Sequence, residues 1–207
     1  GNYYAMHYER FPDFLNYIHK VKMEGRLVNS KVNTDDIAYF APEMKVFDGM
    51  EVLMNGKGGG TVDRIYAKNT SIVNGSSSLF VTDFLMTQLP EIDSSVMWFK
   101  NSVLQTNGME LLRYFPQLAK TKNINYLALG AIKAPFDLLG KVNDFKVKSL
   151  IDSRIGKIDI EGQLSHVLDP IATYKGQLGM HDFEIGTLLN NNVLDKSTAR
   201  VQFSGKG

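Results

Sequence analysis

The chain of 207 residues contains no cysteine. This absence excludes disulfides, thiol nucleophiles and thiolate zinc sites together, and it fits an oxidising compartment as well as the cytosol. No apolar run approaches the ~18 residues that a membrane-spanning helix requires. Neither charge sign dominates, because 23 Lys and Arg oppose 22 Asp and Glu. We therefore expect no nucleic-acid partner, since nucleic-acid binding calls for a clustered basic face.

The sequence also lacks a recognisable catalytic or metal-binding pattern. Its four histidines, His7, His19, His166 and His181, are scattered and show no metal-ligand spacing. No G-x-S-x-G nucleophile motif is present. We therefore expect no enzymatic activity, no metal and no cofactor, with a hydrolase on a β-scaffold as the enzymatic alternative.

Residues 55–61 read NGKGGGT and raise the question of a phosphate-binding loop. That loop needs Ser or Thr directly after its Gly-Lys pair, whereas Gly58 follows Lys57 here. The next residues, TVDRIYAKNT, have the β-branched and alternating character of a strand and not of a helix. We interpret these glycines as a strand bulge, a bend or a hairpin turn where another backbone comes close.

A repeat is the strongest organising feature of the sequence. Units of similar layout begin at Asp36, Glu110 and Glu184, about 74 residues apart. Each unit opens with an acid and a short apolar stretch of helical spacing, and then passes through a polar linker into an alternating strand with glycine. The N-terminal RFPDFLNYIHKVKMEGRLVNS is a looser copy.

Strand-like segments fill the remaining chain. Many alternate at period two, as in KIDIE at 157–161, and turn residues separate them every ~8–14 positions. This pattern predicts a mainly β fold with short helices, in an elongated, repetitive sheet that lengthens by repetition. The abrupt start and end lead us to expect that residues 1–207 are one segment of a longer repeat protein.

Apolar residues recur at every second position of several predicted strands, with polar residues between them. Two interpretations stay open: one face of the sheet packs on its own core, or that face lines an open trough for an apolar guest. The candidate lining residues are Val21, Met23, Leu27, Met50, Val52, Met54, Tyr126, Ala128, Ile132, Tyr174, Leu178, Val201 and Phe203.

The order of these segments resembles the repeat region of TamB-like proteins of the AsmA-like superfamily, the translocation and assembly module of the cell envelope. The resemblance covers roughly residues 10 to 207. It is carried by DDIAYFAPEMK, VLMNGKGGGTVDRIYAKNTSI, LPEIDSSVMWFKNSVLQTNGMELLRYFP, GQLGMHDFEIGTLLNN and TARVQFSGKG in that order. The most characteristic pieces are DFEIGTLL at 182–189 and AKNTSI at 67–72.

The resemblance implies a U-shaped, taco-like β-structure with an apolar concave face. It implies a location in the periplasm, within a protein anchored in the inner membrane. The implied role is movement of phospholipid between the inner and outer membranes, and support of outer-membrane assembly. The implied partners are phospholipid acyl chains and, through regions outside this segment, an outer-membrane protein of the Omp85 class. The alternative is a scaffold or chaperone that pairs its strands with incoming outer-membrane proteins.

Overall fold

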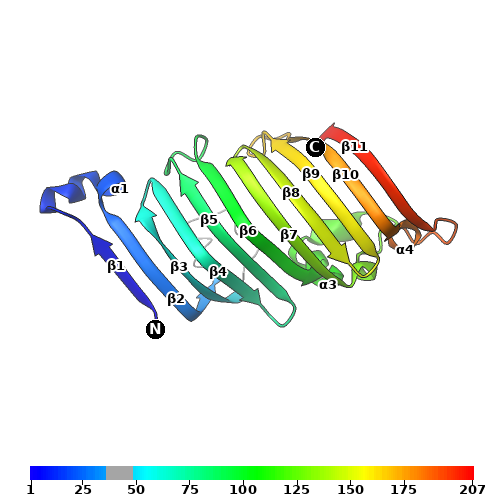
Figure 1. Ribbon diagram of the computed structural model, residues 1–207, viewed down its shortest axis with the longest axis horizontal. Helices are drawn as coiled ribbons and strands as arrows, with labels where there is room; N and C mark the ends of the chain where they lie inside the picture. Colours follow the sequence, from blue (N-terminus) through cyan, green and yellow to red (C-terminus); the bar gives the residue numbers. More distant parts are fainter. Residues whose placement is uncertain (36–48) are drawn as a thin grey trace.

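The computed structural model describes residues 1–35 and 49–207, which form one antiparallel sheet of eleven strands in chain order (Figure 1). The edge strands β1 and β11 do not pair with each other, so the sheet is open. The prediction of a mainly β chain is confirmed. The strands are β1 Tyr3–His7, β2 Lys22–Asn33, β3 Glu51–Thr61, β4 Arg64–Asn74, β5 Ser78–Thr87, β6 Val96–Asn107, β7 Ala131–Lys141, β8 Asp144–Ser153, β9 Gly156–Ser165, β10 Thr173–Glu184 and β11 Lys196–Lys206.

Short helices interrupt this meander, and their ends follow local sequence signals. Asn107 caps α3, because its side-chain oxygen accepts a hydrogen bond from the N–H of Glu110 at 2.9 Å. Asn125 caps η4 in the same way, through the N–H of Ala128 at 3.3 Å. The helical segments are η1 Phe11–Asn16, α1 Tyr17–Lys20, α3 Gly108–Tyr114, η3 Pro116–Lys120, η4 Tyr126–Leu129 and α4 Ile185–Leu188. No helix of the described residues is long and apolar enough to cross a bilayer.

The helices after β6 and β10 stand where two of the predicted repeats begin. Glu110 lies in the first turn of α3, and Glu184 ends β10 directly before α4. Four strands, β7 to β10, therefore separate these two helical interruptions. The third predicted start, Asp36, lies outside the described residues, and the 74-residue period stays a prediction.

The NGKGGGT stretch is part of β3 and pairs with β2 and β4. Gly60 has φ +116°, and a Cβ there would collide with the backbone oxygen of Arg64 across the tight β3–β4 hairpin. A strand follows the glycines, so the interpretation of close backbone approach is confirmed at Gly60.

Three asparagines form a feature that the sequence analysis missed. Asn29, Asn69 and Asn101 all have positive φ, from +46° to +50°, and each lies at a register shift on β2, β4 or β6. Asparagine tolerates this left-handed backbone better than most residues do. The bulges bend their strands and raise the local twist, and they occur on alternate strands of the sheet.

A small closed core joins the helices to the sheet. Phe183 of β10 is 1% exposed and packs in one cluster with Ile155 and Ala128. Leu129, Ile185 and other partly buried residues pack around them. This cluster attaches η4 and α4 to β9 and β10.

Candidate functional site

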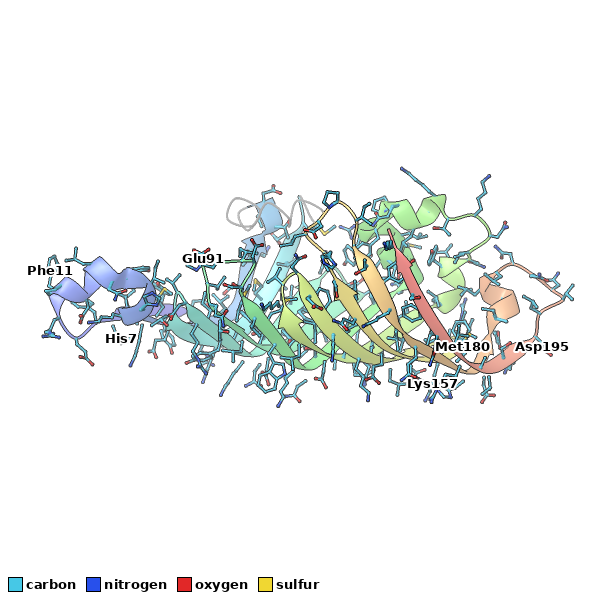
Figure 2. The ribbon with its side chains drawn as sticks, turned by 90° about the horizontal axis from the view of Figure 1, so that it is seen from above. His7, Phe11, Glu91, Lys157, Met180 and Asp195 are labelled. Carbon is cyan, nitrogen blue, oxygen red and sulfur yellow. The ribbon has the colours of Figure 1, made fainter. Side chains whose placement is uncertain are left out.

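The register divides the side chains of the sheet into two faces. Met54 lies opposite Ile72, Ile72 opposite Phe80, and Phe80 opposite Leu104. We call the side of the sheet that carries these four residues the helix-side face, because α3 lies over it (Figure 2). We call the opposite side the outer face.

An apolar row crosses the helix-side face from β3 to β11, one residue from each strand. None of its nine residues is charged, and eight of them are partly buried and partly exposed. A further row toward the β3–β4 hairpin carries the aromatic pair Phe84 and Phe99, whose ring centroids are 5.9 Å apart. The first row comprises Met54, Ile72, Phe80, Leu104, Ala134, Ile151, Ile158, Met180 and Ala199.

A pocket of about 370 Å³ lies between α3 and strands β3 to β6. The sheet lines it with Met54, Ile72 and Phe80, and the helical segment closes it with Leu111 and Phe115. The first three residues belong to the apolar row. The pocket is therefore continuous with the helix-side face and is lined almost wholly by carbon.

Hydroxyl groups lie between the apolar rows. Thr82 and Ser102 are 3% and 1% exposed, and their hydroxyl oxygens are 2.7 Å apart. Ser78 and Thr106 form a second buried hydroxyl pair, at 3.1 Å. Each pair satisfies polar groups that would otherwise be costly to bury. The alternating pattern of the strands gave no signal that separates these positions from exposed serines and threonines.

Most of the predicted lining residues share the helix-side face. Those predicted lining residues that lie in strands all point to the helix-side face, as the strand pairing shows. Met50, just before β3, lines the pocket under α3. The strand residues are Met23, Leu27, Val52, Met54, Ile132, Tyr174, Leu178, Val201 and Phe203.

Two of the predicted strand positions are wrong. Tyr126 and Ala128 lie in the 3-10 helix η4, because the Asn125 cap and the positive φ of Gly130 end the turn before β7 begins. Ala128 is 3% exposed and belongs to the closed core. Val21, at the end of α1, is 0% exposed and is likewise sealed inside.

The outer face holds the charges. In the part of the chain that the structure describes, Lys and Arg outnumber Asp and Glu among the strand side chains that point outward. Among the residues that the structure describes, no three His, Asp or Glu side chains gather as a metal site. The outward-pointing basic residues include Lys22, Arg26, Lys31, Lys57, Arg64, Lys68, Lys100, Lys133, Lys141, Lys146, Lys148, Lys157, Lys175, Lys196, Arg200 and Lys206; the acidic ones include Glu24, Glu51, Asp83, Asp137, Asp144, Asp152, Asp159, Glu161 and Glu184.

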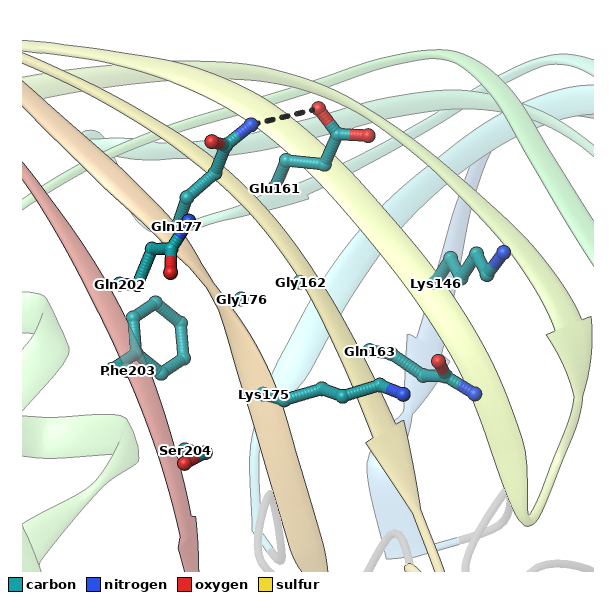
Figure 3. A pocket seen from close by; sticks show the side chains of 10 residues that line it. All are labelled: Lys146, Glu161, Gly162, Gln163, Lys175, Gly176, Gln177, Gln202, Phe203 and Ser204. Carbon is teal, nitrogen blue, oxygen red and sulfur yellow. Dashed lines mark hydrogen bonds between the residues drawn. The ribbon is translucent and has the colours of Figure 1, made fainter.

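A shallow depression of about 520 Å³ on the outer face is polar (Figure 3). The backbone of Gly162 and Gly176 forms its floor. Around them stand Lys146 and Lys175, while Gln177 donates a hydrogen bond to Glu161 at 3.5 Å. Phe203 is the apolar side chain that lines the depression, whereas the pocket under α3 is lined by many.

Hydrogen bonds also fix Asp83 on the outer face. The N–H of Asn69 donates a hydrogen bond to the Asp83 carboxylate at 2.7 Å, and the side-chain amide of Asn101 donates another to it at 3.1 Å. These donors, the Asn69 N–H first, hold the pKa of Asp83 below its ordinary value. Asp83 therefore connects two of the asparagine bulges as a carboxylate.

Comparison with family models, with curated proteins and with solved structures found no match for this chain.

Proposed function

We propose that the chain is a segment of a TamB-like cell-envelope protein whose helix-side face receives phospholipid acyl chains. The observation that carries the proposal is the uncharged apolar row from Met54 to Ala199, which is continuous with the pocket under α3. In this proposal the sheet is U-shaped, the helix-side face is concave, and repeats on either side extend the apolar surface.

The energetics favour a long hydrocarbon guest. Transfer of a CH₂ group from water to an apolar surface gains about 0.8 kcal/mol, so an acyl chain of ~16 carbons gains on the order of 10 kcal/mol when fully enclosed. The partly exposed side chains of the row leave surface available for such contact. A guest of this kind needs a continuous apolar lining and no catalytic group.

The proposal extends to the cellular setting that the resemblance implies. The segment would act in the periplasm, within a protein anchored in the inner membrane. It would help to move phospholipid between the two membranes and support outer-membrane assembly. An Omp85-class partner would bind through other regions of the protein.

Lipid extraction and mass spectrometry of the purified chain test the proposal. We expect co-purifying phospholipid, and we expect Met54→Glu to reduce it at least tenfold, because a carboxylate would enter the apolar row. Leu53→Glu is the matched control, since Leu53 is the neighbouring residue, is 39% exposed and faces outward. Leu178→Arg against outward-facing Gln177→Arg repeats the comparison in β10.

Equal lipid content in Met54→Glu and Leu53→Glu, with both variants folded by circular dichroism, would refute the lipid proposal. The alternative is strand pairing with outer-membrane proteins, and the open edge of β11, eleven residues long, favours it. Binding of unfolded strand peptides that survives Met54→Glu and Leu178→Arg would support this alternative instead.

A further inference from the structure

Like charges face each other directly on the outer face. Arg26 pairs with Lys57 across β2 and β3, and Lys57 pairs with Lys68 across β3 and β4. Like charges directly opposite each other on a sheet destabilise it. In the described part of the chain, no carboxylate lies within ion-pair distance of these three side chains. The fold therefore tolerates a cationic triplet that does not help to hold it together.

An exposed row of aromatic and aliphatic side chains runs next to this triplet. Tyr66, Leu85, Trp98 and Leu139 are cross-strand neighbours on β4 to β7. Tyr66, Trp98 and Leu139 are 40%, 37% and 54% exposed. The ammonium group of Lys100 lies 4.2 Å from the centre of the Trp98 ring, so positive charge borders the row at Trp98 as well.

Two acids share this part of the outer face with the basic side chains. Asp83 lies opposite Lys100 and its carboxylate also interacts electrostatically with Lys68, while Glu24 lies two residues before Arg26 on the same face. The four basic residues Arg26, Lys57, Lys68 and Lys100 outnumber these two carboxylates. The local surface is therefore positive, although the whole chain has a net charge of only +1.

We propose that this part of the outer face, from the triplet of Arg26, Lys57 and Lys68 to the row from Tyr66 to Leu139, docks on the surface of an anionic lipid bilayer. Basic side chains near such a surface gain free energy from anionic headgroups, and Trp and Tyr favour the interface between headgroups and hydrocarbon. Lys and Arg can lay their aliphatic stems on the membrane while their charges reach the phosphates. This inference goes beyond the proposed function, because it concerns the opposite face of the sheet.

The aliphatic members of the row favour a bilayer over a nucleic acid. Single-stranded nucleic acids bind through bases stacked on aromatic rings along a basic groove. Here Leu85 separates Tyr66 from Trp98 and Leu139 follows Trp98, so two of the four positions offer no ring for stacking. Aliphatic side chains do gain from contact with lipid.

Vesicle flotation tests the proposal with the full chain. We expect binding to vesicles of phosphatidylcholine with about 30% phosphatidylglycerol, and no binding to phosphatidylcholine alone. The triple variant Arg26→Gln, Lys57→Gln, Lys68→Gln should lower the partition coefficient by about 100-fold, and Lys57→Gln alone by about fivefold. Trp98→Ala should weaken binding at both low and high salt.

The matched control removes the same charge from the helix-bearing side through Arg113→Gln, Lys120→Gln, Lys122→Gln. It should retain binding within about threefold. The cationic triplet variant should unfold at the same or a higher temperature, because it removes repulsion. Met54→Glu should bind vesicles like the unaltered chain, because Met54 lies on the helix-side face. The vesicle result is therefore independent of whether the helix-side face receives acyl chains.

Equal loss in the triplet and control variants would overturn the proposal, as would equal binding to neutral vesicles. Binding to a 30-nucleotide single-stranded DNA as tight as binding to the anionic vesicles, at the same salt, would also overturn it in favour of a general polyanion site.

Discussion

The closed core around Phe183 yields the sharpest stability prediction. Phe183 is 1% exposed and is the largest fully buried side chain among the described residues. Its ring packs in the cluster that joins η4 and α4 to β9 and β10. Replacement of a fully buried phenylalanine by alanine costs about 3–5 kcal/mol, because burial is lost and a cavity remains. We expect Phe183→Ala to lower the free energy of unfolding by this amount.

Urea denaturation followed by circular dichroism measures the change, and hydrogen exchange locates it. We expect faster exchange at residues 125–130, because the N–H of Asn125 donates to the oxygen of Leu188 at 2.7 Å and depends on the same packing. Phe203→Ala is the control, since Phe203 is partly exposed on the edge strand β11. It should cost less than about 2 kcal/mol.

A loss below about 1 kcal/mol in Phe183→Ala, or a loss equal to that of Phe203→Ala, would refute the reasoning. Either result would mean that the packing of this cluster does not hold η4 and α4 against the sheet.

Three further predictions concern the sheet itself. Ser102→Ala combined with Thr82→Val should cost less free energy of unfolding than the sum of the two single changes, because either single change already removes the hydrogen bond that the two hydroxyls share. A double-mutant cycle by urea denaturation measures this, and additivity would contradict it. Asp83→Asn should make the melting temperature fall less steeply as the pH is lowered. The pKa of Asp83 is lowered in the folded chain, so its carboxylate stabilises the fold above about pH 3.9, and this stabilisation is lost as the pH falls through the folded pKa. Circular-dichroism melts from about pH 6 to pH 2 check this, and unchanged acid sensitivity would argue against it. Gly60→Ala should destabilise the chain by about 1–3 kcal/mol, whereas Gly75→Asn, at a turn tip with φ +61° and open space, should cost under about 0.5 kcal/mol; equal thermal melts would refute the strained position of Gly60.

The sequence predicted the class of fold because period-two alternation and turn residues are local signals. Met54, Ile132 and Leu178 were each expected on a strand face, and pairing places them on the same side of one sheet. The error at Tyr126 and Ala128 has a local cause, since a four-residue 3-10 helix with an Asn cap is too short to show a helical period.

The charge distribution could not be predicted from totals. The totals of 23 basic and 22 acidic residues do not show that the outer face is rich in Lys and Arg. The adjacency of Arg26, Lys57 and Lys68 depends on the register of three strands, and the bulges on β2 and β4 set part of that register. Residues 31 and 11 positions apart in the chain thus became neighbours.

The sequence by itself determined that the chain forms strands with one apolar face each, because the alternation of apolar and polar residues is a property of neighbouring positions. Only the tertiary structure decided that these faces join in one row from β3 to β11, that α3 closes a pocket on them, and that Val21 and Ala128 are buried in closed packing. The physical reason is that strand order, register and helix packing arise from contacts between distant residues, and local periodicity carries no information about them.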